Sequence, residues 1–134
     1  MNRAVGIGTY KELLPQPNCP PKDANQTSEL LAYRLIPHFT AQENDFMSHA
    51  ALGKPCPPHE DTCRWASCSF FINIDKCKAM NKLPSLKRKY KHIAHVKLGP
   101  LSGMTKLDHQ SSHLDVWMFA AFDPLTSVIH TEPV

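Results

Sequence analysis

His113 and Asp115 are spaced so that they could carry out acid–base chemistry. They lie two positions apart at the start of 113–120, where the residues alternate as they do in a β-strand. Residues two apart on a strand point to the same face, so the carboxylate can hold the imidazole in one tautomer and make His113 an oriented general base. The alternative is that both residues belong to an ordinary polar face, opposite the apolar face of the strand.

Arg34, Ser67 and Ser69 form a second group of candidate functional residues. Arg34 lies in the apolar run 29–36, which predicts a buried strand that Pro37 ends, although so short a run also suits a helix. Ser67 and Ser69 share one face of a second predicted strand, 63–72, together with aromatic residues. Hydroxyls among aromatic side chains can line a pocket for a planar ligand, or they can be ordinary packing residues.

The spacing of this second group resembles the start of the ADP-ribosyltransferase pattern. In that superfamily an arginine on the first strand holds a phosphate of NAD, and a Ser-Thr-Ser strand supports the cofactor site. Arg34, after Tyr33, matches the arginine, and Ser67 and Ser69 match the serines, with Cys68 in the threonine position. An arginine fork suits a phosphate, whereas lysine keeps the charge but loses the fork. The resemblance therefore implies that Arg34→Lys removes most NAD affinity and leaves stability nearly unchanged.

The resemblance also implies a later acidic residue, usually a glutamate, that orients the ribose and the acceptor. The only glutamate after the second predicted strand is Glu132, so Asp108 or Asp115 would take this role, with His113 assisting the transfer. The implied function is that of a small NAD-dependent transferase, a toxin or effector that modifies a protein or a nucleic acid.

The charge distribution indicates a second class of function. The formal net charge is only +3, but 76–107 carries nine lysines or arginines and no acidic residue. Such asymmetry favours an anionic partner, and the candidate anion-binding residues are Lys87, Arg88, Lys89 and Lys91. The chain would then be a non-catalytic binding module whose basic face, 76–97, docks nucleic acid or an acidic protein. A solvated basic face without a partner is the remaining alternative.

The cysteines and the apolar runs bear on the location of the protein. The five cysteines are an odd number and no signal peptide is recognisable, so we expect reduced thiols and a cytoplasmic location. The spacing of Cys56, Cys63, Cys68 and Cys77 differs from the close pairs of structural zinc sites, so we expect no metal. No apolar run reaches the roughly 18 residues that a membrane-spanning helix needs.

The elements that must position these residues are expected to form one domain, 28–134, after a loosely held Pro-rich arm, 1–27. Their order predicts an α+β fold with a mixed or mainly antiparallel sheet and a few short helices. The predicted elements are strands at 29–36, 63–72, 92–98, 113–120 and 127–130, a helix at 40–52, a short helix at 75–81, a basic turn at 86–91 and a polar loop at 106–112. The expected core contains Leu31, Leu35, Phe70, Ile72, Ile93, Val96, Val116 and Met118.

Overall fold

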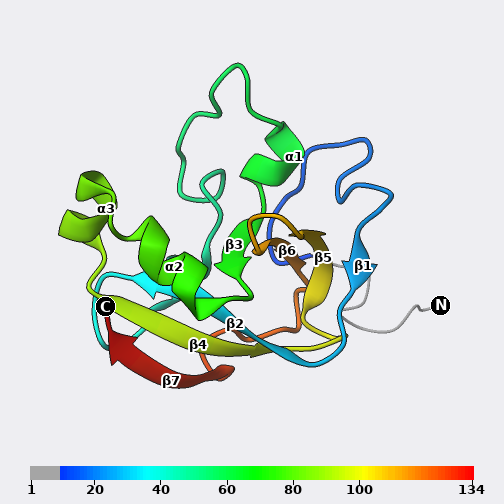
Figure 1. Ribbon diagram of the computed structural model, residues 1–134. Helices are drawn as coiled ribbons and strands as arrows, with labels where there is room; N and C mark the ends of the chain where they lie inside the picture. Colours follow the sequence, from blue (N-terminus) through cyan, green and yellow to red (C-terminus); the bar gives the residue numbers. More distant parts are fainter. Residues whose placement is uncertain (1–9) are drawn as a thin grey trace.

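The computed structural model describes residues 10–134. In this part of the chain, seven antiparallel strands form a single sheet (Figure 1). The strand order is β1-β5-β6-β3-β2-β4-β7. The strands are β1 (Asn25–Gln26), β2 (Leu30–Ile36), β3 (Cys68–Phe71), β4 (His92–Leu98), β5 (Gly103–Asp108), β6 (His113–Met118) and β7 (Val128–Pro133). The prediction of a mainly antiparallel sheet with a few short helices is confirmed, and strands dominate the fold.

Capping residues and a proline define the starts of the three α-helices found within residues 10–134. Asp61 caps α1 (Thr62–Trp65) and Asn73 caps α2 (Ile74–Met80), each through a side-chain oxygen that accepts backbone N–H groups. Proline opens α3 (Pro84–Lys89), where its missing N–H would have no partner in any case. The short helix predicted at 75–81 is therefore confirmed with bounds one residue earlier, and most of the predicted basic turn at 86–91 is helical. Within residues 10–134 no helix is long and apolar enough to cross a membrane.

The helix predicted over 40–52 is wrong. Only η1 (Glu43–Phe46) is helical, as one 3-10 turn with the Asp45 carboxylate in its capping pair. Backbone groups that a longer helix would use are bonded elsewhere. The carbonyl of Asp45 accepts a hydrogen bond from Arg34, and the N–H of Ser48 donates to the carboxylate of Glu12. Tertiary contacts therefore override the local helix signal.

Two predicted strand boundaries also differ from the structure. The predicted strand 63–72 starts as α1, so β3 begins only at Cys68. The predicted polar loop 106–112 contains the end of β5, which pairs with β6. Gly103 in β5 lies against the backbone of β6, and a Cβ there would clash with the carbonyl oxygen of Trp117. Glycine in this strand thus allows close approach of two backbones rather than marking a loop.

The main core covers one face of the sheet. On β2 the buried side chains are Ala32 and Ile36, and Arg34 shares their face. The prediction that Leu31 and Leu35 form the buried face of this strand is wrong, since Leu31 is 38% exposed and Leu35 is only half-buried. Five other predicted core residues are buried, namely Phe70, Ile93, Val96, Val116 and Met118, while Ile72 is half-buried.

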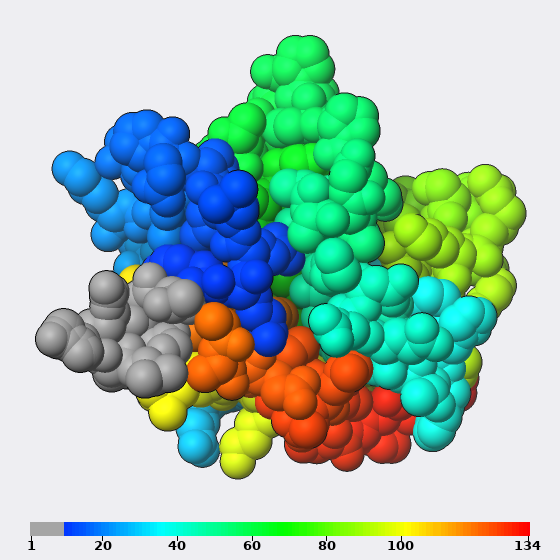
Figure 2. All heavy atoms as spheres, turned by 180° about the vertical axis from the view of Figure 1, so that it is seen from behind, coloured from blue at the N-terminus to red at the C-terminus, as the bar shows by residue number. Residues whose placement is uncertain are grey.

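The segment 10–27 packs against the domain and is not a loosely held arm. Leu14 is buried in a second apolar cluster with Ala66 and Trp117. Figure 2 shows this segment (blue) between the chain near residue 60 (green) and the end of β6 (orange). The expectation of a loose arm is therefore corrected for these residues, and its first nine residues lie outside the part that the structure describes.

A disulfide fixes this segment covalently. It joins Cys19 to Cys63 at the start of α1, across a sequence separation of 44 residues. The expectation that all five thiols are reduced is wrong for these two cysteines. Within residues 10–134, Cys56, Cys68 and Cys77 are free, and the last two are buried.

Candidate functional site

A cleft with a volume of about 580 Å³ opens where β2 and β3 diverge. The two strands are registered at a single position, Tyr33 with Phe71, whereas β2 follows β4 along its whole length. The space beside the short ladder is walled by β2, β3, the loop 44–54 and α3. Its lining includes half of the residues selected from the sequence, namely Arg34, Ser67, Ser69, His113 and Lys89.

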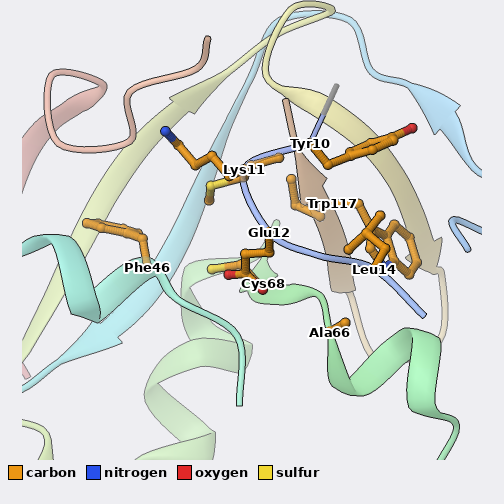
Figure 3. Close-up of a pocket in the computed structure, with 10 residues that line it drawn as sticks. Tyr10, Lys11, Glu12, Leu14, Phe46, Ala66, Cys68 and Trp117 are labelled. Atoms are coloured by element: carbon orange, nitrogen blue, oxygen red, sulfur yellow. The ribbon is translucent and has the colours of Figure 1, made fainter. Parts of the chain in front are cut away.

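A second pocket lies under the N-terminal segment and is too small for an organic ligand. It has a volume of about 10 Å³ and lies among Glu12, Phe46, Cys68 and Trp117 (Figure 3). That space suits about one water molecule. The cleft between β2 and β3 is therefore the candidate site.

Arg34 bridges the gap between the two diverging strands. Its Nε donates to the carbonyl of Asp45 and its Nη1 to the carbonyl of Ser69, both at 2.6 Å. The guanidinium carbon lies 5.9 Å from the centre of the Phe70 ring. No described residue bonds to Nη2, so that edge of the guanidinium is available to an anion in the cleft. The arginine is thus both a structural link and a fixed donor.

Ser67 and Ser69 lie on the wall opposite β2. Ser67 is buried, and its hydroxyl donates to the carbonyl of Arg64 at 2.7 Å, so its proton is already committed. Ser69 is half-buried in β3, directly opposite Asp115 of β6. No described residue bonds to its hydroxyl, which can therefore donate to a ligand. Of the two serines, Ser69 is the better placed for ligand contact.

His113 and Asp115 are paired, as their spacing on a strand predicts. His113 Nδ1 lies 3.3 Å from Asp115 Oδ1, and Asp115 Oδ2 lies 3.3 Å from Nε of Arg64. His113 lines the cleft, whereas Asp115 is only 7% exposed and lies behind it. The imidazole is therefore the group that a ligand would meet, and the carboxylate lies next to its Nδ1.

Burial shifts the pKa values of this pair in opposite directions. Burial lowers the pKa of His113, against the opposing effect of the Asp115 charge. Burial also raises the pKa of Asp115, against the attraction of His113 and Arg64. Neutral imidazole is consequently favoured near pH 7, which is the form that a general base requires.

The lining of the cleft is electropositive. Three cations line it, Arg34, Lys54 and Lys89, against one carboxylate among the described residues, that of Asp45. The pKa of the lining residue His49 is lowered by burial first and then by all three cations. This field favours an anionic ligand.

The loop 44–54 supplies lining residues that the sequence analysis missed. His49 stacks on Trp65 with ring centres 4.4 Å apart, and Trp65 Nε1 donates to the carbonyl of Lys54 at 2.9 Å. These contacts hold the loop beside the cleft. Because the segment was predicted to be helical, no pattern in the sequence pointed to a role for His49 or Lys54.

Several residues selected from the sequence lie outside the cleft lining. Asp108 is exposed at the end of β5, where its carboxylate accepts the N–H groups of the next turn, and these bonds lower its pKa. It is not placed to act in the cleft. Three of the four candidate anion-binding residues, Lys87, Arg88 and Lys91, are exposed but do not line the cleft.

Comparisons with known proteins do not place the chain in a family. No family model, no curated protein and no solved structure matches it.

Proposed function

We propose that the chain is an NAD-dependent enzyme of the ADP-ribosyltransferase type, a toxin or effector that modifies a protein or a nucleic acid. The observation that carries the proposal is the convergence of Arg34, Ser67, Ser69 and His113 on one electropositive cleft. Its volume lies in the range of small-molecule sites, roughly 300–1,000 Å³.

The residues divide naturally between binding and chemistry. Arg34, through its unbonded edge, would hold the pyrophosphate of NAD, with Lys54 and Lys89 contributing further positive charge. The Ser69 hydroxyl and the Phe71 ring would border the nicotinamide. These placements use a rigid arginine for the charged part of the ligand and a strand wall for the planar part.

The transfer step needs one base. The bond between the nicotinamide nitrogen and the ribose carbon breaks, and an acceptor nucleophile forms a bond to the same carbon. Nicotinamide leaves as a neutral molecule, and His113 takes the proton of the acceptor on Nε2 while Nδ1 faces Asp115. Asp115 replaces the usual glutamate by holding the histidine rather than by touching the ribose.

Titration with NAD, followed by tryptophan fluorescence, tests the binding step. Trp65 should report it because it stacks on His49 of the cleft lining. Lys89→Gln should weaken NAD binding by about tenfold, a loss of roughly 1.4 kcal/mol. The matched control is Lys87→Gln, on the same helix but outside the cleft, which should bind as the wild type does. A wild-type protein that does not respond to NAD would contradict the proposal.

The second candidate function is a non-catalytic module that binds nucleic acid or an acidic protein through the basic face 76–97. The exposure of Lys87 and Arg88 on α3 favours it. Reversing the charges of Lys87, Arg88 and Lys91 should then remove binding of an oligonucleotide and flatten its salt dependence, because fewer counterions are released. If the NAD site is the functional one, the same triple variant should keep its affinity for NAD.

The location of the protein belongs to this proposal as well. A cytoplasmic location stays a prediction, and the Cys19–Cys63 disulfide counts against it, because disulfides persist in oxidising compartments. We favour maturation in such a compartment, which suits an exported effector. Mass spectrometry of alkylated protein isolated from its natural source would decide the point: three alkylated cysteines support export and five support the cytoplasm.

A further inference from the structure

A cluster of two histidines and a glutamate lies on β4 and β7, the two strands that follow β2 in the order of the sheet. His95 on β4 and His130 and Glu132 on β7 place one ligand atom each within 4.8 Å of one another. His95 Nε2 is 3.0 Å from Glu132 Oε2, and His130 Nε2 is 3.8 Å from the same oxygen. The cluster uses none of the cysteines on which the expectation of no metal depended.

We propose that His95, His130 and Glu132 form a binding site for a divalent transition metal of the zinc type. Zinc bonds to histidine nitrogen and carboxylate oxygen are about 2.0–2.2 Å long, so neighbouring ligands of a tetrahedral site lie roughly 3.4 Å apart. The two distances from Glu132 Oε2 lie on either side of that value, and the ligand atoms of His95 and His130 lie within 4.8 Å of each other. Two imidazoles and one carboxylate are also a ligand set that zinc uses with a fourth, open position.

A β-bulge brings these ligands together. The pairing of β4 with β7 shifts register between His95 and Val96, so that His95 faces His130 and Val96 faces Val128. Because His95 and Val96 point to opposite faces of β4, the bulge also puts Val128 and His130 on opposite faces. Val128 packs on the core while His130 joins His95. Without the bulge, residues 128 and 130 would point to the same face, so Val128 could not pack on the core while His130 lies beside His95.

The surroundings hold the ligand atoms but leave an approach from solvent. The Tyr33 ring packs edge-on against His95 at 4.9 Å between ring centres. Lys78 lies 3.6 Å from Glu132 Oε1, which leaves Oε2 directed at the histidines. His95 is largely buried, whereas the His130 side chain is 58% exposed. A metal would therefore reach the cluster from the His130 side and would tie the edge strand β7 to β4.

Zinc titration by calorimetry tests the proposal on the full chain. A Cys56→Ser background removes the partly exposed thiol that could bind zinc on its own. We expect one zinc per chain, a higher melting temperature with zinc, and no response to magnesium. His130→Gln should weaken zinc binding about 100-fold or more, since even second-shell groups change metal affinity 10–100-fold.

Two variants control for charge and for the mere loss of a histidine. Lys78→Gln removes the ion pair to Glu132 but no ligand, so it should keep or increase zinc affinity. His109→Gln removes an exposed histidine outside the cluster and should bind zinc as the background protein does.

Cobalt(II) gives a readout that does not depend on folding stability. A tetrahedral site should give strong visible absorption without a thiolate charge-transfer band, and His130→Gln should abolish it. Three results would each overturn the proposal. The first is a thiolate band, and the second is equal zinc affinity of His130→Gln and the background protein. The third is no zinc binding at 100 μM, which is about tenfold above a Kd of 10 μM. In that case the cluster is only a histidine–carboxylate ion pair.

Discussion

Replacing Arg34 by lysine should destabilise the protein by about 2–3 kcal/mol as well as weaken NAD binding. In the structure the guanidinium donates two short, partly buried hydrogen bonds, to the carbonyls of Asp45 and Ser69. Hydrogen bonds that involve a charged group contribute about 1.5–3 kcal/mol each. A lysine ammonium can replace one of them but cannot reach both carbonyls with the arginine geometry. The expectation from sequence, that this change leaves stability nearly untouched, is therefore revised.

Urea unfolding measures this effect directly. With a slope of about 1.5 kcal/mol per molar urea, the midpoint should fall by roughly 1–2 M while the slope stays constant. The matched control is Arg88→Lys on the exposed surface of α3, which should change stability by less than about 0.5 kcal/mol. If Arg34→Lys unfolds at the wild-type midpoint, the guanidinium does not link β2 to β3 and our account of the cleft is wrong.

Three further predictions follow from the same contacts. Replacing both Cys19 and Cys63 by alanine should lower the free energy of unfolding by roughly 4 kcal/mol, the loop-entropy value for a closed loop of this length. Urea unfolding of the variant and of the oxidised wild type measures this loss. An equal midpoint would show that the bond does not constrain the unfolded chain. Val116→Ala should cost about 1–4 kcal/mol, from lost burial and a partial cavity, and an unchanged midpoint would contradict its place in the core. Burial lowers the pKa of His113 in the folded protein, so the unfolded chain binds a proton at higher pH than the folded chain does. The contribution of neutral His113 to stability is therefore present above about pH 6.5 and is lost progressively as the pH falls from 6.5 to the lowered pKa of the folded state. Below pH 6.5 the stability of His113→Gln should therefore fall less steeply than that of the wild type, and parallel pH profiles would refute the shift.

Sequence reasoning located β4 and β6 well because each has clear limits. The strand 92–98 was predicted with its actual bounds, since a basic run precedes it and Gly99-Pro100 stops it. β5 was missed because alternating exposed residues such as Lys106 made it look like a loop. The function of Gly103 in that strand depends on the position of the Trp117 carbonyl, which belongs to a neighbouring strand and leaves no local signal.

The candidate site could be predicted in part for a similar reason. Arg34, Ser69 and His113 lie on strands, where spacing along the chain determines the face on which a side chain points. The structure brings these residues to one cleft. His49 and Lys54 lie on a loop whose position depends on the stacking of His49 on Trp65, a contact between segments that no periodicity encodes. The sequence analysis expected Leu31 and Leu35 on the buried face of β2, because the charged Arg34 lies in the middle of the face that is actually buried, between Ala32 and Ile36.

The single registered pair between β2 and β3 has a mechanical consequence. It divides the sheet into two well-paired halves, β1-β5-β6-β3 and β2-β4-β7. Within each half the strands share several registered pairs, so each half resists bending as a unit. Between the halves, backbone pairing is limited to Tyr33 and Phe71, so β2 and β3 are held together mainly by core packing, such as that of Ile36 and Phe70, and by the hydrogen bond from Arg34 to Ser69. The width of the cleft is therefore set by side-chain contacts rather than by a backbone ladder.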